Sequence, residues 1–222
     1  VVGDALSVIA SGPTVAPVGT RAEARAALAA RGLWDQLPDP VRAYLAQPAE
    51  IDDPLPDADN RLIGSNAASV LAMGSAGARA MPRPLTGDVE EAVHVVMTAV
   101  QSLPAGKAIG FGGETTVTIR GDGKGGRNQE LALRFALLAE QRRLSGDWVF
   151  LAAGTDGRDG PTDAAGGIIH PGTLTRMRRE GIDPRRALDN NDSHTALSCC
   201  GGLVLTGATG TNVADLCVFL RA

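Results

Sequence analysis

The stretch Gly110–Leu138 constrains the fold of this 222-residue chain more than any other part. It begins with a glycine-rich turn, continues into the β-branched run Thr115–Ile119, and ends in an apolar run. Within that last run Leu131, Phe135 and Leu138 recur at helical spacing, which predicts a helix with one face packed on a core. The stretch therefore predicts a strand, a glycine-rich loop and a helix in immediate succession.

The glycine-rich loop Gly121–Gly126 lies directly before the first turn of this predicted helix. Backbone N–H groups converge at such a point, the helix dipole favours negative charge, and glycine allows a close approach. Arg127 opens the helix and could offer a planar fork of donors to a phosphate. The ordinary alternative is a first-turn arginine paired with Glu130 or with solvent. The loop also matches G-x-G-x-x-G, so dinucleotide binding with Asp156 on a ribose hydroxyl stays open.

Strands and helices alternate along the rest of the chain, which predicts an α/β fold with a three-layer sheet and helices on both faces. We expect strands at Arg61–Gly64, Pro82–Thr86, Lys107–Phe111, Thr115–Arg120, Trp148–Ala153, Gly202–Leu205 and Leu216–Leu220. We expect helices from Thr20 to Gly32, at Pro38–Gln47, from Ser65 to about Ala80, after a cap at Asp88, at Thr173–Glu180, at Pro184–Leu188, and after Asn190–Ser193.

Four loops rich in glycine, threonine or asparagine each follow a predicted strand. They are Gly110–Thr115, Gly121–Asn128, Gly154–Asp163 and Thr206–Asn212. Ligands of open α/β sheets bind outside the carboxyl ends of the strands, so we expect these loops to converge on one site. For any single loop, ordinary turn chemistry is the better explanation, and it is the set of four that favours a site.

Three carboxylates in the third loop, Asp156, Asp159 and Asp163, could hold Mg²⁺ or orient a hydroxyl nucleophile. The alternative is a solvated acidic loop. The three histidines have no spacing typical of a metal site, and the chain contains neither a Walker motif nor a G-x-S-x-G nucleophile elbow.

Composition excludes several classes of function. The net charge of −4 and the low aromatic content of 3% argue against a nucleic-acid-binding surface. No apolar run reaches the roughly 18 residues that a membrane span needs, and no signal peptide is evident. The three cysteines have no metal spacing and are typical of a reducing compartment, so we expect a cytoplasmic protein.

The acidic, proline-rich segment Pro48–Asn60 is the predicted internal boundary. It separates residues 1–60, which we interpret as the end of an N-terminal domain with its linker, from a C-terminal domain at 61–222. The chain begins without methionine, and we expect it to be part of a larger protein.

The motifs in these loops resemble the C-terminal half of class II glycerate kinases, the MOFRL-type enzymes. The resemblance rests on GGETTVTIRGDGKGGRNQELAL, GTDGRDGPTDAAGG, NNDSH and TGATGTN, which occur in the family's order. Val2–Thr14 is similar to the segment that closes the family's Rossmann-like N-terminal domain. The resemblance implies ATP-dependent phosphorylation of D-glycerate to 2-phosphoglycerate, with Mg²⁺. Some family members are called hydroxypyruvate reductases, so an NAD(P)H-dependent reductase is the alternative, and a catalytically inactive remnant is a third hypothesis.

Carried over to this chain, the resemblance implies Arg127, Asp156 and Asp163 as catalytic residues, with Asp156 or Asp163 as the metal ligand. The implied substrate- or nucleotide-binding residues are Ser11, Gly12, Asn66, Gly113, Glu114, Thr115, Gly125, Gly126, Asn128, Glu130, Asp192, Thr209 and Asn212. Glycerate is the implied small-molecule substrate, with no nucleic-acid or membrane partner, and a homodimer is compatible with the sequence. The family's functional lysine lies before residue 1 of this chain, and neither Lys107 nor Lys124 matches it.

Overall fold

The computed structural model describes residues 3–48 and 55–222 of the chain. These residues form two compact units, one of which is Asp4–Ile63 and the other of which consists mainly of Gly64–Ala222. The predicted linker Pro48–Asn60 falls partly outside the described residues, and the part at 55–60 contains neither helix nor strand.

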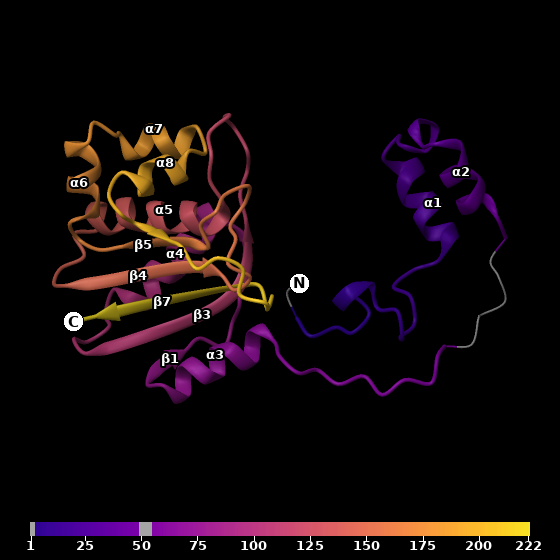
Figure 1. The fold of residues 1–222 in the computed structure, drawn as a ribbon, viewed down its shortest axis with the longest axis horizontal. Coiled ribbons are helices and arrows are strands. Elements are labelled where there is room, and N and C mark those ends of the chain that lie inside the picture. Colours follow the sequence, from indigo (N-terminus) through magenta and orange to yellow (C-terminus); the bar gives the residue numbers. More distant parts are fainter. Residues whose placement is uncertain (1–2, 49–54) are drawn as a thin grey trace. The chain divides into compact units, whose positions relative to one another are not determined.

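The N-terminal unit contains the two helices that the sequence predicts for it (Figure 1). Its elements are η1 (Ile9–Ser11), α1 (Arg21–Ala30), η2 (Trp34–Gln36) and α2 (Asp39–Ala46). The capping box before α1 is confirmed, because Thr20 accepts a hydrogen bond from the Glu23 N–H while the Glu23 carboxylate accepts one from the Thr20 N–H at 2.7 Å. No side chain of α1 or α2 is fully buried within this unit.

The C-terminal unit is built on a seven-stranded sheet in the order β1-β3-β7-β4-β5-β6, with β2 also paired to β3. The strands are β1 (Ala78–Ala80), β2 (Leu85–Asp88), β3 (Lys107–Thr116), β4 (Trp148–Gly154), β5 (Gly166–Ile169), β6 (Leu203–Val204) and β7 (Asp215–Arg221). β1 and β2 run parallel to β3, whereas every other pairing is antiparallel. The predicted α/β class is confirmed, with a mixed sheet.

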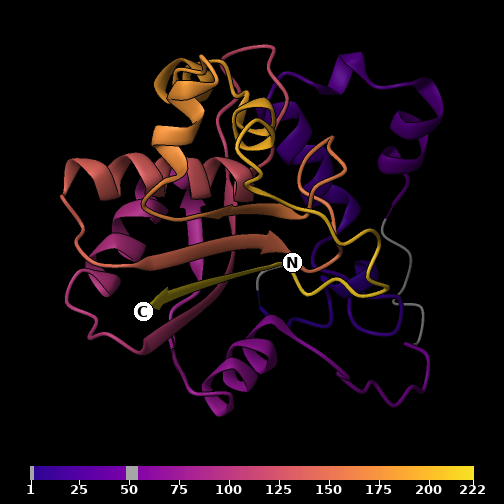
Figure 2. The ribbon, with the colours of Figure 1, turned by 60° about the vertical axis from the view of Figure 1, so that its left-hand side comes forward.

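Helices lie on both faces of this sheet (Figures 1 and 2). They are α3 (Asn66–Ser75), α4 (Val89–Val100), α5 (Arg127–Gln141), α6 (Thr173–Arg179), α7 (Pro184–Asp189) and α8 (Ser193–Ser198). α3 packs on β1 and β3, while α5 packs on β4 and β5 with α4 beside it. The three short helices α6, α7 and α8 pack in turn on α5, so most of α5 is buried.

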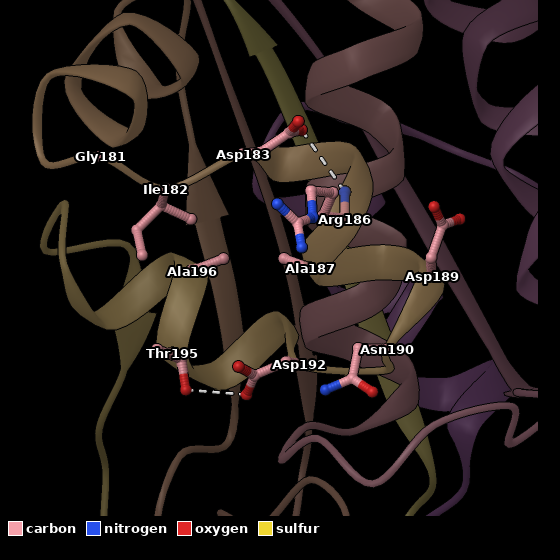
Figure 3. A pocket seen from close by; sticks show the side chains of 10 residues that line it. All are labelled: Gly181, Ile182, Asp183, Arg186, Ala187, Asp189, Asn190, Asp192, Thr195 and Ala196. Atoms are coloured by element: carbon pink, nitrogen blue, oxygen red, sulfur yellow. Dashed lines mark hydrogen bonds between the residues drawn. The ribbon is translucent and has the colours of Figure 1, made fainter.

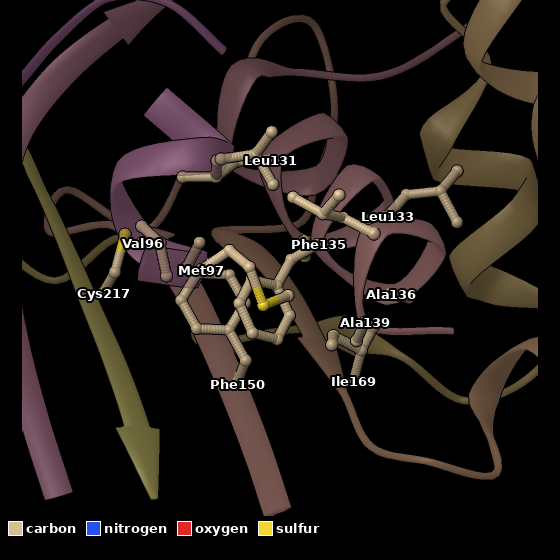
Figure 4. Close-up of a cluster of buried hydrophobic side chains, with 14 of the residues drawn as sticks. Val96, Met97, Leu131, Leu133, Phe135, Ala136, Ala139, Phe150, Ile169 and Cys217 are labelled. Atoms are coloured by element: carbon tan, nitrogen blue, oxygen red, sulfur yellow. The ribbon is translucent and has the colours of Figure 1, made fainter. Parts of the chain in front are cut away.

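The core lies between α5 and the sheet, and Phe135 of α5 is at its centre (Figure 4). Its ring centroid is 5.6 Å from that of Trp148, 4.5 Å from that of Phe150 and 5.8 Å from that of Phe219. Alternate residues of β4 and β7 supply these partners, as expected for side chains on one face of a sheet. This core holds the first turn of α5 in a fixed place at the edge of the sheet.

β3 is one continuous strand, so the prediction of two strands separated by a glycine turn is wrong. Its glycines serve close packing instead. A Cβ on Gly110 would lie 2.8 Å from the Met73 side chain, and one on Gly112 would lie 2.0 Å from Asn66 Oδ1. Glycine therefore lets α3 approach the sheet closely. The strand ends at Thr116, and the predicted continuation to residue 120 is absent.

Other boundaries also differ from the predictions. Arg61–Gly64 forms no strand, since its residues are exposed and have no paired neighbour in the sheet. The helix predicted to continue to about Ala80 ends at Ser75, because Gly77 takes a positive φ of 101° and turns the chain into β1. The strand predicted at Pro82–Thr86 begins only at Leu85, and β5 was not predicted at all.

The remaining predicted helices are confirmed within one or two residues, including α4 behind its Asp88 cap. Within residues 3–48 and 55–222, no helix combines the length and the apolar character that crossing a bilayer requires.

Candidate functional site

Three strand ends meet at one edge of the sheet. Gly113 of β3 and Gly154 of β4 both pair with Asp215, the first residue of the antiparallel β7. The loops that follow β3 and β4 and the loop that precedes β7 therefore lie at this edge. Three of the four loops singled out in the sequence are brought together here.

Close backbone contacts join these loops. A Cβ on Gly157 would lie 1.9 Å from the Gly207 carbonyl oxygen, and one on Gly160 would lie 2.3 Å from the Gly125 carbonyl oxygen. Both glycines have positive φ, so only glycine fits these positions without strain. The loop 155–165 is thus packed between the glycine-rich loop and the loop before β7.

Arg127 lies at this end of the sheet, in contact with two acidic side chains. Its Nε donates to Asp215 Oδ2 at 2.6 Å, and its Nη2 donates to Asp215 Oδ1 at 2.8 Å. Glu114 Oε1 is 3.6 Å from the same Nη2. We call Arg127, Asp215 and Glu114 the Arg127 cluster. Hydrogen bonding to Asp215 raises the pKa of Arg127, although partial burial acts in the opposite direction.

The sequence predicted Arg127 and Glu114 but not Asp215. Arg127 also differs from the ordinary alternative, since its partner is not Glu130. Its side chain is 30% exposed, whereas that of Asp215 is 6% exposed, so the arginine is the accessible member of the pair. A guanidinium bound along its Nε–Nη2 edge keeps Nη1 for another acceptor, such as a phosphate oxygen.

Other residues of the chain occupy the space where side chains of the loop glycines 121–126 would lie. A Cβ on Gly121 or Gly123 would collide with Asn190, and one on Gly125 would lie 2.3 Å from Ser193 Oγ. A Cβ on Gly126 would lie 2.3 Å from Asp159 Cγ. These glycines let the loop pack on the α7–α8 turn and on Asp159. That Gly125 and Gly126 bind substrate or nucleotide through their backbone stays a prediction.

The first turn of α5 binds an anion, but this anion is the carboxylate of Asp159. Its Oδ1 accepts from the Asn128 N–H at 3.1 Å and from Asn128 Nδ2 at 3.2 Å. Its Oδ2 accepts from the Gln129 N–H at 2.8 Å and from Gln129 Nε2 at 3.0 Å. Asp159 is only 1% exposed, and this burial raises the pKa of its carboxyl while the N–H donors lower it. The helix N-terminus is thus capped from inside.

Asn128 and Glu130 were predicted as ligand contacts, but the structure buries both, at 1% and 2% exposure. Glu130 binds Arg134 at 2.9 Å and Asn191 at 3.1 Å. The Asn191 side chain also accepts hydrogen bonds from the backbone N–H groups of Arg120 at 2.6 Å and Gly121 at 3.1 Å. These residues hold the glycine-rich loop in place from behind.

Asp163 and Asp192 lie around the first turn of α8. Asp163 Oδ1 is 3.0 Å from His194 Nε2, and this contact lowers the pKa of the Asp163 carboxyl. Asp192 accepts hydrogen bonds from the Lys124 N–H and from the Thr195 hydroxyl. Asp192 also lines a pocket of about 590 Å³ between α7 and α8 (Figure 3). Neither carboxylate is bonded to the Arg127 cluster.

Asp156, Thr209 and Asn212 lie on the two loops that flank the Arg127 cluster. Asp156 Oδ1 accepts a hydrogen bond from the Arg158 N–H, and the Asp156 carbonyl accepts one from the Thr209 N–H at 3.3 Å. Asn212 accepts one from the Ala214 N–H at 3.1 Å. Thr209 and Asn212 are exposed, and Asp156 is half-buried, so all three are open to a ligand.

The other predicted residues lie elsewhere or face inward. Asn66 donates to the backbone carbonyls of Val213 and Asp215, and it supports the turn before β7. Gly113 and Thr115 are buried inside β3. Ser11 and Gly12 belong to the N-terminal unit, where Gly12 ends η1.

The carboxylates at this end of the sheet suit a Mg²⁺ ion that is also held by bound phosphates. Among residues 3–48 and 55–222, no group of three or more histidine, cysteine or acidic side chains is arranged to hold a metal ion. Mg²⁺ commonly takes one or two carboxylates and completes its octahedral shell with water and phosphate oxygens. Asp156 can provide one such carboxylate.

Comparison with known proteins gives two family matches. The MOFRL family matches residues 107–215, which include all three members of the Arg127 cluster. A domain of unknown function (DUF4147) matches residues 1–46.

Individual relatives agree with these matches. The chain is 38% identical to the glycerate 2-kinase of Pyrococcus horikoshii, over 98% of this chain and 53% of that protein. It is 35% identical to the glycerate kinase of Macaca fascicularis, over 100% of this chain and 70% of that protein. A relative from Agrobacterium vitis, 40% identical over 96% of this chain and 51% of its own length, has a hydroxypyruvate reductase name.

The fold is also similar to that of a solved structure. The crystal structure of glycerate kinase from Thermotoga maritima aligns with a TM-score of 0.81 and 37% identity, covering 100% of this chain and 55% of that one. The chain therefore spans about half the length of most of these proteins.

Proposed function

Because the chain belongs to the MOFRL-type glycerate kinase family, we propose that it contributes the phosphate-facing part of an enzyme that phosphorylates glycerate. In the proposed reaction ATP donates a phosphoryl group to the 2-hydroxyl of D-glycerate. The observation that carries this proposal is the placement of Arg127, which lies where three loops converge and is partly exposed.

Phosphoryl transfer depends mainly on positioning and on neutralising charge, and little on covalent chemistry by the protein. Arg127 suits this task because its fork of donors is fixed along one edge and accessible at the other. We assign it to the phosphoryl group in flight, where negative charge spreads over the equatorial oxygens.

We assign the carboxylate role to Asp156. It lies on the loop after β4, next to Thr209 of the opposite loop, and it could accept the proton of the substrate hydroxyl or hold Mg²⁺. A bound Mg²⁺ would supply charge neutralisation at the phosphate oxygens. Asp163 is already engaged with His194, so we place it at the margin of the site.

Thr209, Asn212 and Glu114 complete the proposed contact surface. The hydroxyl and amide groups of the exposed loop before β7 can hydrogen-bond a nucleotide or the hydroxyls of glycerate. Glu114 lies 3.6 Å from Arg127 and can accept a hydrogen bond from glycerate or share a metal.

The alternative is an NAD(P)H-dependent hydroxypyruvate reductase, which the name of the Agrobacterium relative favours. The dinucleotide interpretation depended on the glycines of the loop 121–126 giving room for a pyrophosphate. Those glycines instead adjoin Asn190, Ser193 and Asp159 of the same chain. The structure therefore removes the main geometric support for the alternative.

Two assays on the complete product of the gene distinguish these activities. One follows ADP formation with ATP, Mg²⁺ and D-glycerate, and the other follows absorbance at 340 nm with NADH or NADPH and hydroxypyruvate. We expect glycerate-dependent ADP formation and no oxidation of the reduced cofactors. Hydroxypyruvate-dependent oxidation without ADP formation would overturn the proposal.

A further inference from the structure

Ala214, directly before β7, has an unusual backbone conformation. Its φ is +62°, in the left-handed region that residues other than glycine, asparagine and aspartate rarely adopt. The residue is 4% exposed. Such a conformation persists only where the surrounding structure imposes it, and it is enriched at functional sites.

Three side chains impose this conformation. The Thr155 hydroxyl donates to the Ala214 carbonyl at 2.7 Å and accepts from the Val213 N–H at 2.8 Å. Asn212 Oδ1 accepts from the Ala214 N–H at 3.1 Å. On the other side, Asn66 Nδ2 donates at 2.8 Å to the carbonyls of the residues before and after Ala214. The turn is therefore fixed from α3, from the loop after β4 and from within.

This turn fixes the position of the Asp215 carboxylate. Asp215 is the first residue of β7 and pairs with Gly113 of β3 on one side and Gly154 of β4 on the other. Its side chain is 6% exposed. Both of its oxygens are bonded to Arg127, at 2.6 and 2.8 Å. A bidentate pair of this kind fixes the plane of a guanidinium as well as its place.

We propose that Asp215 is the positioning residue of the site, and that the strained turn 212–215 exists to hold its carboxylate against Arg127. Asp215 holds the Nε–Nη2 edge of the guanidinium and thereby directs Nη1 towards the bound phosphate. The inference rests on the proposed function for the identity of that phosphate, but its geometric half can be tested without turnover.

Fixing the guanidinium has a physical advantage for phosphoryl transfer. An arginine on a flexible stem would have to be ordered each time the transition state forms, whereas a held one is preorganised. Asp215 also offsets the charge of Arg127 before substrate binds. Without it, a half-buried cation would be left without this counter-charge, which costs free energy. Glu114 lies too far from Nη2, at 3.6 Å, to replace the paired carboxylate.

The variants Asp215→Asn and Asp215→Glu test this role. The amide keeps one acceptor but loses the charge and the second acceptor, while the longer acid keeps the charge and loses the position. Glu140→Gln is the matched control, since it removes the carboxylate of another bidentate arginine pair, Glu140–Arg178, at an exposed site outside the Arg127 cluster.

Kinetics on the complete gene product give the first readout. We expect kcat for glycerate phosphorylation to fall about 10²-fold in both Asp215 variants, the size typical of a misplaced catalytic group. We expect KM for ATP to change less, and both constants to stay at wild-type values in Glu140→Gln. A kcat equal to that of the wild type in either Asp215→Asn or Asp215→Glu would overturn the proposal.

Nuclear magnetic resonance gives the second readout, which does not depend on activity. The Arg127 Nε–Hε signal, identified by its absence in Arg127→Lys, should exchange slowly with water in the wild-type chain and quickly in Asp215→Asn. An Hε that exchanges quickly in the wild type would overturn the positioning role by itself. A wild-type protein without glycerate kinase activity but with the slow signal lost in Asp215→Asn would refute the proposed function and support the held arginine.

Discussion

Arg127 shows what a sequence can and cannot predict at the scale of one residue. Its place after a glycine-rich loop indicated a helix start and a donor for phosphate, and both the helix start and its exposure are seen in the structure. Its partner Asp215 lies 88 residues further along the chain. No local pattern links two residues at that distance, since their pairing follows from the order of strands β3, β7 and β4 in the sheet.

Gly113 of β3 has a backbone conformation that requires glycine. Its φ is +146°, and a Cβ there would lie 2.0 Å from the Leu85 carbonyl oxygen of the neighbouring strand. We expect Gly113→Ala to lower the free energy of unfolding by about 2 kcal/mol or more, because backbone strain is added to a backbone clash. Chemical denaturation followed by circular dichroism measures this change.

Gly64→Ala is the matched control for that substitution. A Cβ at Gly64 would find its nearest neighbour at 3.9 Å, in ordinary contact with the Val213 side chain. We expect a change within about 0.5 kcal/mol, as for surface substitutions in general. Equal effects of the two variants would contradict the account of β3.

At the scale of elements, the helices were predicted better than the strands. The 3.6-residue period of α4 and α5 and the Asp88 cap of α4 are local signals, and both helices begin where the sequence indicated. β3 was divided wrongly because its glycines look like a turn until α3 is placed against them. β5 begins with Gly166 and Gly167, and its pairing with β4 and β6, which are distant in the sequence, makes it a strand.

Asp88 gives a prediction for one helix. Its carboxylate accepts a hydrogen bond from the Glu90 N–H at 2.8 Å and so caps α4. Asp88→Ala should lower the free energy of unfolding by about 1 kcal/mol, while Asp88→Asn should cost less because asparagine also caps well. Denaturation midpoints of the three proteins at neutral pH measure both effects.

The same cap has a defined pH dependence. The bond from the Glu90 N–H lowers the pKa of Asp88 below its unfolded value, which is about 3.9 for aspartate. The contribution of the charge is therefore complete above the unfolded pKa and is lost as pH falls through the lower, folded pKa. The difference between wild type and Asp88→Asn should shrink below about pH 4. A difference that stays constant down to pH 2 would exclude a role for the charge.

The scale of the whole molecule adds what the separate loops could not predict. The family was predicted from ordered motifs and the α/β class from the alternation of strands and helices, and both are confirmed by the relatives and by the fold of the Thermotoga enzyme. The convergence of three loops on Asp215 depends on the mixed sheet, in which β7 runs antiparallel between β3 and β4. The boundary near residue 60 stays a prediction for the gene product, although the chain divides into compact units at Ile63 and Gly64.

This division predicts independent stability. Within the described residues, every fully buried hydrophobic side chain belongs to the C-terminal unit, beginning with Val70. We expect a protein of residues 64–222 to unfold cooperatively with a midpoint within about 3 °C of the full chain, a shift that corresponds to roughly 1 kcal/mol. A midpoint lower by about 10 °C or more, seen by calorimetry, would show that residues 1–63 contribute to the same core.

The role of Arg127 in phosphorylation of glycerate is the central claim, and one measurement tests it most directly. The complete gene product and its Arg127→Ala variant are each given ATP, Mg²⁺ and D-glycerate, and the phosphorylated product is followed by ³¹P nuclear magnetic resonance. We predict that the wild type forms 2-phosphoglycerate and that the rate of the variant is lower by about 10²-fold or more, as expected for the loss of a transition-state donor. Wild-type rates from Arg127→Ala, with its fold intact, would contradict the account.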